Sequence, residues 1–292
     1  MFFAEKYRKA VWVLSLGVGI LVILAPVLNG QYFPSAPYYI PTDPRVNNTL
    51  VVGLLICLLF PAIVEACNYR WRKQVDKNIP RLLRDIAEAV RSGVTLPRAL
   101  EEAAQRDYGP LSKEIERAVA MFICGATWED AMNTLARRLK QPNAKRLATI
   151  LIEAHKTGGK LMRILDTSVR LFSSFDEYQE ERNTKTKPYV LTIYMGTIIF
   201  LIIVYVVLNQ LLAPLCLNLP QIQGNMNVVA DLPSIEYFNS ILFWAAIVQS
   251  LCGGLIAGKI ESGSLPAGMR HSVILLSATL MFFNVLGSIG GG

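Results

Sequence analysis

The residues that could do chemistry form no catalytic arrangement in this 292-residue chain. Residues 158–161, with the sequence Gly-Gly-Lys-Leu, resemble part of a phosphate-binding loop. That loop requires a different upstream residue and a hydroxyl side chain directly after the lysine. The two histidines, His155 and His271, lie far apart, and neither belongs to an H-E-x-x-H zinc motif. We interpret both as helix-end residues, and we expect no enzymatic activity, cofactor or metal of this chain's own.

Charged residues are concentrated in the middle of the sequence. Residues 68–187 hold 23 basic and 16 acidic residues, and the net charge of the whole chain is +7. The basic residues include two groups: Arg81, Arg84, Arg91 and Arg98, and then Arg137, Arg138, Lys140, Lys145 and Arg146. These groups could form a solvated face or attract anionic lipid headgroups, or they could dock an acidic cytoplasmic partner. Nucleic acid is not expected, because no nucleic-acid-binding motif is recognisable.

The elements that flank this charged segment are apolar. Hydrophobic residues make up 52% of the sequence and charged residues 17%, which is typical of an integral membrane protein. Crossing a bilayer takes roughly 17–25 apolar residues. We predict five transmembrane helices, at residues 11–28, 50–67, 189–212, 237–257 and 272–289. Two alternatives remain open: the first run could be a cleaved signal peptide, and the last could be a re-entrant segment.

The distribution of positive charge predicts the topology. With five spans, 28 of the 29 Lys and Arg residues fall on one side of the membrane, and only Arg45 falls on the other. Basic residues favour the cytoplasmic side. We therefore expect a multi-pass protein of the cell (inner or cytoplasmic) membrane, with a cytoplasmic N-terminus and an external C-terminus. The external loop 29–49 contains one N-x-T sequon, which makes Asn47 a glycosylation candidate.

This pattern divides the chain into three parts. Residues 1–67 hold two spans and the outer loop, residues 68–187 form a cytoplasmic helical domain, and residues 188–292 hold three spans. Pro188 suits the first turn of the third span. Within the domain we predict six helices, at residues 79–91, 95–106, 111–124, 127–139, 144–156 (started by Pro142) and 160–187. The fold class is therefore an all-α polytopic membrane protein with a six-helix domain between spans 2 and 3.

A short pattern recurs three times in the domain. Gly93, Gly125 and Gly158 each follow a helical segment, and apolar residues recur three and six or seven positions later. We expect helix hairpins that turn at these glycines and at Gly159, with a positive φ at Gly93 and Gly125. Thr95 and Thr127 are the expected caps of the helices that follow. The competing interpretation is that all short helical hairpins look alike.

Taken together, these residues resemble the F-protein family of type II secretion and type IV pilus machines. The resemblance rests on RSGVTLPRAL at 91–100, GATWEDAM at 125–132 and TGGKL at 157–161, in a charged helical domain followed by a span. The C-terminal segment GGLIAGKI at 253–260, with Gly268 and His271, is similar to archaeal members, which include the archaellum platform protein.

The resemblance implies a membrane platform that is not itself an enzyme. Such a platform couples a hexameric secretion ATPase to the insertion or extraction of pilin-like subunits in the bilayer, so the two basic groups would form the ATPase dock. Many members carry two such cytoplasmic domains and this chain has one, which implies a homodimer or a paired half-size partner.

Two other classes of protein were weighed. Residues 100–104, with Gly109 following, resemble the coupling motif of an ABC-type transporter membrane subunit, although the glycine is one position late and the domain far exceeds a coupling loop. A membrane receptor with a helical signalling domain would show long unbroken heptads, which the repeated glycines interrupt.

Overall fold

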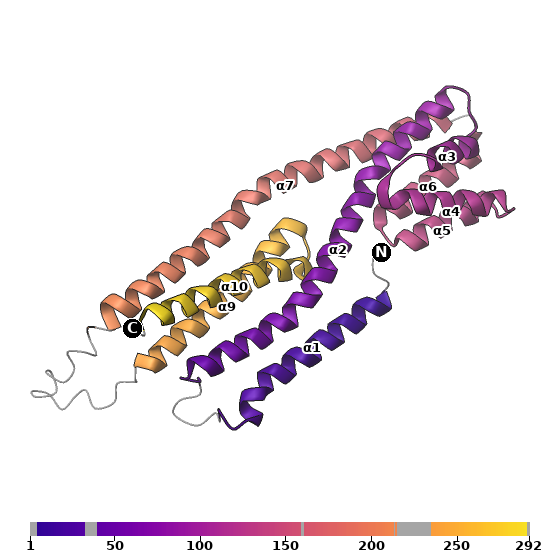
Figure 1. Cartoon of the computed structure of the whole chain (residues 1–292). Coiled ribbons are helices and arrows are strands. Elements are labelled where there is room, and N and C mark those ends of the chain that lie inside the picture. Colours follow the sequence, from indigo (N-terminus) through magenta and orange to yellow (C-terminus); the bar gives the residue numbers. More distant parts are fainter. Residues whose placement is uncertain (1–4, 33–39, 159–160, 213, 215–234, 291–292) are drawn as a thin grey trace, which may run out of the picture. The chain divides into compact units, whose positions relative to one another are not determined.

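The computed structural model describes residues 5–32, 40–158, 161–212, 214 and 235–290, and all regular elements in them are helical. Figure 1 shows α1 (Glu5–Leu28), α2 (Pro44–Arg91), α3 (Leu96–Ala104), α4 (Ser112–Ile123), α5 (Trp128–Leu139), α6 (Pro142–Thr157), α7 (Leu161–Val206), α9 (Ile235–Ser262) and α10 (Leu265–Gly290). A 3-10 turn, η1 (Gly109–Leu111), precedes α4, and a π-helical turn, η3 (Val207–Leu212), follows α7. The predicted all-α fold class is confirmed.

The chain divides into two compact units. We call Cys67–Thr184 the central helical domain, and Glu5–Ala66 with Lys185–Gly292 the membrane unit. Helices α2 and α7 each contribute residues to both units. In the part of the chain that the structure describes, five helices are long and apolar enough to cross a membrane: α1, α2, α7 with η3, α9 and α10. The five predicted spans fall within them, so the protein is a polytopic membrane protein.

The helix boundaries differ from the predictions in α2. This helix runs without interruption for 48 residues from Pro44 to Arg91, although we predicted a span at 50–67 and a separate helix at 79–91. Residues 68–78 contain no glycine or proline and several long polar side chains that favour a helix, so nothing breaks it there. Because α2 begins at Pro44, the outer loop is also shorter than the predicted 29–49.

A second difference concerns Pro188. We placed it in the first turn of a new helix, but it lies inside the 46-residue helix α7. A proline removes one backbone hydrogen bond and its ring crowds the preceding turn, yet α7 continues through Pro188. The segment predicted as 160–187 and the third span therefore form one helix.

Asn47 lies in the first turns of α2, and its side chain is buried, with 4% exposed. Its amide nitrogen donates to the Pro41 carbonyl at 2.9 Å and to Ser240 Oγ at 3.2 Å. Its carbonyl oxygen accepts from Trp244 Nε1 at 2.9 Å. Asn47 thus joins α2 to α9 in the membrane unit. A glycan would need this buried and bonded nitrogen, so the contacts disfavour glycosylation of the folded chain.

The core of the central helical domain contains the recurring apolar residues. Leu96, Ala99 and Leu100 are buried after the first turn, Trp128, Ala131 and Met132 after the second, and Leu165 after the third. Consecutive helices pack on one another from α3 to α6. The recurring spacing therefore places equivalent apolar residues of three helix starts in a common core.

The turns at Gly93 and Gly125 have the same hydrogen bonds. Gly93 has a φ of 97° and Gly125 a φ of 96°, the left-handed conformation that we predicted. The amide of Gly93 donates to the Val90 carbonyl, and the amide of Val94 donates to the Ala89 carbonyl. The amides at 125 and 126 do the same to Phe122 and Met121. Both helices therefore end in a Schellman motif.

Candidate functional site

The nine basic residues proposed for partner binding are all exposed in the central helical domain. Arg81, Arg84 and Arg91 lie on α2, while Arg98 lies on α3. The other five lie at the end of α5, on the turn after it and at the start of α6. The structure therefore places the two sequence groups on two different helix pairs.

Most residues of the first group have acidic or aromatic neighbours. Arg91 pairs with Asp166 at 2.8 Å, and Arg98 pairs with Glu101 at 2.9 Å. The Arg81 guanidinium lies 5.6 Å from the centre of the Tyr108 ring. Arg84 makes no ion pair with a described residue. Arg91 and Arg98 are therefore paired with carboxylates, while Arg81 and Arg84 have no acidic partner among the described residues.

Tyr108 is the buried anchor beside this group. It is fully buried, and its hydroxyl donates to Asp85 at 2.6 Å. Burial raises the pKa of the Tyr108 hydroxyl, and the hydrogen bond to the Asp85 carboxylate raises it further. Tyr108 is thus a neutral hydrogen-bond donor at physiological pH, and its role is to hold η1 against α2.

The second group is split by helix geometry. Arg137, Lys140 and Lys145 line a surface hollow of about 640 Å³ between α5 and α6, together with Asp130 and Asn133. The remaining two basic residues are directed elsewhere: Arg138 pairs with Glu114 at 2.6 Å, and the Arg146 guanidinium lies 5.4 Å from the Phe175 ring centre. Adjacent residues on a helix lie on different faces. Three of the five residues therefore share one concave basic surface.

The turn between α5 and α6 has an unusual backbone conformation. Lys140, which ends α5, has a positive φ of 52° although it is not a glycine. Gln141 is extended because Pro142 follows it, and Pro142 opens α6. The α5–α6 connection is therefore a tight left-handed cap, which positions Lys140 and Lys145 at the same rim.

The predicted turn glycines occupy the ends of their helices. Gly93 follows α2 and Gly125 follows α4, while Gly158 ends α6 with a φ of 54°. Gly159 lies outside the described residues. Thr127 caps α5: its Oγ1 accepts from the Asp130 amide at 3.1 Å and donates to the Asp130 carboxylate at 2.7 Å. Thr95 stands at the equivalent position of α3 but makes no side-chain cap bond.

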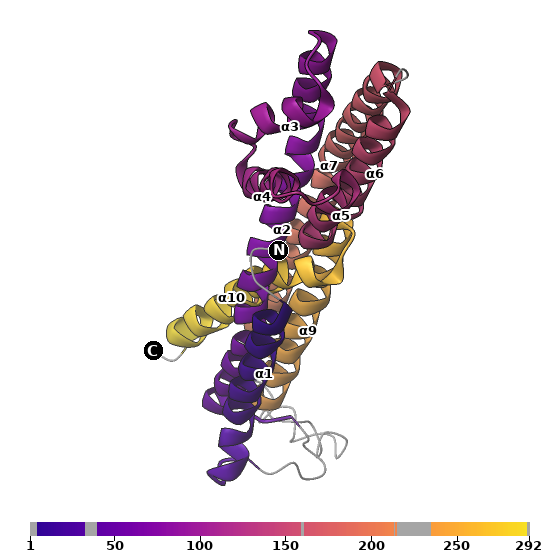
Figure 2. The ribbon, with the colours of Figure 1, turned by 90° about the vertical axis from the view of Figure 1, so that its right-hand side faces the viewer.

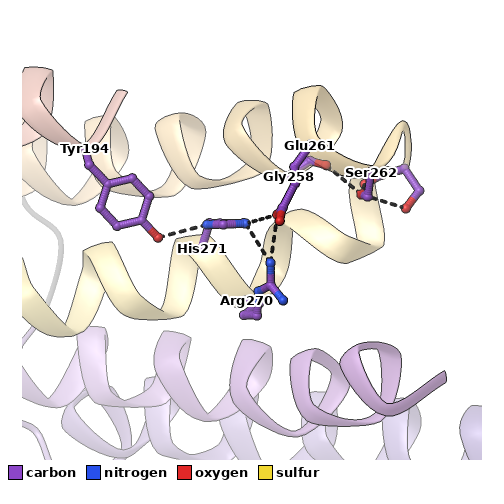
Figure 3. Close-up of polar contacts among 7 residues, drawn as sticks. Tyr194, Gly258, Glu261, Ser262, Arg270 and His271 are labelled. Carbon is purple, nitrogen blue, oxygen red and sulfur yellow. Dashed lines mark hydrogen bonds and ion pairs between the residues drawn. The ribbon is translucent and has the colours of Figure 1, made fainter. Parts of the chain in front are cut away.

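A polar chain in the membrane unit was missed by the sequence analysis. Figure 3 shows Tyr194 of α7, His271 of α10 and Glu261 of α9 in a row. The Tyr194 hydroxyl lies 2.9 Å from His271 Nδ1, and His271 Nε2 lies 2.7 Å from Glu261 Oε2. Arg270 donates to the same Glu261 oxygen at 2.7 Å. His271 is only 7% exposed, so it is a buried hub and not the helix-end residue that we predicted.

A carboxylate oxygen only accepts, so His271 donates to Glu261 Oε2 in the tautomer that carries its proton on Nε2. Arg270, which also lies 3.1 Å from this Nε2, donates to the same Glu261 oxygen. His271 Nδ1 then accepts the Tyr194 hydroxyl proton when the imidazole is neutral. When the imidazole is charged, Nδ1 instead donates to the Tyr194 oxygen. The chain therefore holds α7 to the α9–α10 hairpin in either protonation state.

Glycines bring the two helices of the hairpin together beneath this chain. A Cβ atom on Gly258 would overlap the backbone of Gly268, and one on Gly254 would overlap the backbone of Ser272. Ser272 Oγ donates to the Leu251 carbonyl at 3.0 Å, and Ser250 and Thr279 bond at 2.7 Å. Figure 2 shows that the C-terminal end of α10 lies apart from the N-terminal end of α9. The close contact thus occupies the half of the hairpin near its loop, where it aligns Glu261 with His271.

The arrangement offers positioning and electrostatic docking. Within the described residues there is no group of three or more His, Cys, Asp or Glu that could hold a metal ion. The other chemically notable histidine, His155, is exposed and stacks on Trp128 with ring centres 5.0 Å apart.

Comparison with known proteins gives a family match over the middle of the chain. Residues 82–208 match the family model described as type II secretion system (T2SS), protein F. The chain is also 28% identical, over 243 residues, to an uncharacterized protein of Methanocaldococcus jannaschii. That alignment covers 83% of this chain and 38% of the relative, so the chain spans well under half of the relative's length. No solved structure matches the chain.

Proposed function

We propose that the chain is the membrane platform of a type II secretion or type IV pilus-like machine, because residues 82–208 match the family model of type II secretion system protein F. It would couple a cytoplasmic hexameric ATPase to the assembly of pilin-like subunits. The ATPase would supply the chemistry, and the platform would supply docking and transmission of movement. Neither role requires a catalytic residue in this chain.

The observation that carries this proposal is helix α7. It runs for 46 residues from Leu161 in the central helical domain to Val206 in the apolar span, without a glycine until Gly196. A continuous helix resists bending more strongly than a glycine-rich linker. Movement applied to the domain would therefore reach the membrane unit through α7, and Tyr194 would pass it to the α9–α10 hairpin.

The basic hollow at the α5–α6 turn supports the docking part of the proposal. Arg137, Lys140 and Lys145 line a concave surface, and concave clusters of one charge sign attract partners of the opposite sign. The ATPase face that binds here would be acidic. Arg84 and its neighbours on α2 would make a weaker contribution, because Arg91 and Arg98 already have acidic partners.

This function also needs an orientation and a partner. We propose that the N-terminus and the central helical domain are cytoplasmic and that the C-terminus is external, as the charge distribution favours. Because the chain matches less than half of a longer relative, a second copy or a paired half-size protein would complete the platform.

The alternative of an ABC-type transporter subunit lacks support. Residues 100–104, which resemble a coupling motif, lie in α3, where Leu100 and Ala103 are buried in the domain core. A coupling motif would instead present its residues to a nucleotide-binding partner.

Docking is tested with the purified chain in lipid vesicles and a secretion ATPase from the same organism. Reversing Arg137, Lys140 and Lys145 to Glu should weaken ATPase binding, and the residual binding should depend less on salt. A control variant reverses Arg163, Arg170 and Arg182, three exposed basic residues of α7, and carries the same change in net charge. Equal loss of binding in both variants would refute the assignment of the hollow.

Coupling is tested separately. Inserting Gly-Ser-Gly-Ser after Thr184 breaks the helical connection in α7 and leaves the hollow untouched. We expect ATPase binding to persist and filament assembly to be lost. Normal filaments from this variant would refute rigid transmission through α7, while docking could still hold.

A further inference from the structure

A second hollow of the central helical domain lies between α2 and the start of α4. It has a volume of about 580 Å³. Cys67, Arg70, Trp71 and Gln74 of α2 line one side, and Gly109 and Lys113 line the other. The platform function proposed above makes no use of this hollow.

The hollow carries two positive charges that the described residues do not neutralise. Arg70 and Lys113 are both exposed, and neither forms an ion pair with a side chain in the described ranges. The carboxylate of the hollow, Glu114, already pairs with Arg117 at 2.7 Å and with Arg138 at 2.6 Å. An anion between Arg70 and Lys113 would therefore meet two free cations.

The position of the hollow along α2 identifies the kind of anion. Cys67 ends the apolar run 50–67, and Arg70 follows three residues later in the same helix. Three residues of α-helix rise about 4.5 Å, which places Arg70 at the level of the lipid headgroups. Trp71 is half-buried beside it, and tryptophan is enriched at this depth because its ring is apolar and its N–H is polar.

We propose that this hollow binds the headgroup phosphate of an anionic phospholipid. Arg70 and Lys113 donate to the phosphate oxygens, and Trp71 packs against the glycerol region. The acyl chains then leave the hollow past Cys67 along the apolar part of α2. The proposal goes beyond the platform function and does not depend on the ATPase.

The experiment uses the full chain in nanodiscs of phosphatidylglycerol and phosphatidylcholine, with bound lipid measured by native mass spectrometry. The chain should retain phosphatidylglycerol in preference to phosphatidylcholine. A basic side chain near an anionic surface strengthens binding about fivefold, so Arg70→Gln with Lys113→Gln should weaken retention about 30-fold. The control, Lys73→Gln with Arg163→Gln, removes two exposed charges outside the hollow and should retain the lipid.

Three results would overturn the proposal. The first is retention of phosphatidylglycerol by the Arg70–Lys113 variant at the level of the unmodified chain. The second is an equal loss in the control, which would mean that net charge alone attracts the lipid. The third is displacement of the lipid by inorganic phosphate at equal concentration, which would identify a site for the free anion. The far-UV circular dichroism and unfolding midpoint of each variant establish that the fold is intact.

Discussion

The contact between Gly258 and Gly268 gives the sharpest quantitative prediction. A Cβ atom on Gly258 would overlap the Gly268 backbone and lie 2.9 Å from the carbonyl carbon of Ala267. Carbon atoms are attractive only from about 3.5 Å outward. Because the obstructing atoms are backbone, Gly258→Ala forces α9 and α10 apart.

The loss in the free energy of unfolding follows from the contacts between α9 and α10 that this separation breaks. Overpacking costs about 1–3 kcal/mol, and each lost interhelical hydrogen bond in a membrane costs about 0.6 kcal/mol. The bonds at risk are Ser272 Oγ to the Leu251 carbonyl, at 3.0 Å, and Ser250 to Thr279, at 2.7 Å. Alanine favours a helix over glycine by about 1 kcal/mol. The net loss in the free energy of unfolding should be about 2 kcal/mol.

The assay is reversible unfolding in mixed detergent micelles, followed by tryptophan fluorescence. The control is Gly196→Ala in α7, where a Cβ atom would meet nothing within 4 Å. That variant should be as stable as the unmodified chain or more stable, by up to about 1 kcal/mol. Equal stability of the Gly258 and Gly196 variants would refute the close contact of α9 and α10.

Three further predictions test other parts of the chain. Gly125→Val places a β-branched residue at a φ of 96° and should destabilise the central helical domain by roughly 1–2 kcal/mol in urea unfolding; an unchanged midpoint would contradict the turn. Tyr108→Phe removes the hydroxyl that donates to Asp85 at 2.6 Å and should cost about 1–2 kcal/mol in the same assay, whereas a neutral effect would show that the bond is dispensable. With Cys124, which is exposed, as the single cysteine, a membrane-impermeant maleimide should react only after lysis; Gln31→Cys in a cysteine-free chain should react on intact cells, and the reverse pattern would invert the proposed topology.

The sequence predicted the features that depend on local chemistry. Five apolar runs were enough to predict five membrane-crossing helices, because length and composition decide whether a helix can span a bilayer. Gly93 and Gly125 were predictable as turns, since a Schellman motif is built from six consecutive residues. Local signals also predicted the Thr127 cap of α5.

The helix boundaries and the polar chain were harder to predict. Pro188 was interpreted as a helix start because proline is favoured in the first turn of a helix and disfavoured in its interior, whereas α7 continues through it. The partners of His271 are non-local: Tyr194 lies 77 residues away and Glu261 lies 10 residues away. The sequence signal that could have indicated this polar chain was a histidine directly after Arg270, in a short connection that contains Gly263 and Gly268.

Two site predictions show why neighbouring residues need not act together. The sequon at Asn47 is a three-residue pattern, and it carries no information about the burial that Trp244 and Ser240 impose on that side chain. Arg137 and Arg138 are adjacent in sequence, yet one lines the basic hollow while the other pairs with Glu114. A charge count identifies the basic segment, and only the positions of its residues on the helices separate the two faces.

The α9–α10 hairpin has a consequence for how the protein enters the bilayer. The hydroxyl groups of Ser250, Thr279 and Ser272 are bonded within the hairpin, whereas Ser240 and Trp244 bond to Asn47 of α2 and His271 lies against Tyr194 of α7. Helices α9 and α10 could therefore pair with each other as they leave the translocon, before Asn47 and Tyr194 bond to them. Helix α7 precedes α9 and α10 in the chain, so it would already lie in the membrane when α10 inserts and His271 contacts Tyr194. The last step of biogenesis would then be a lateral closure of the preinserted α7 onto a hairpin that has already folded.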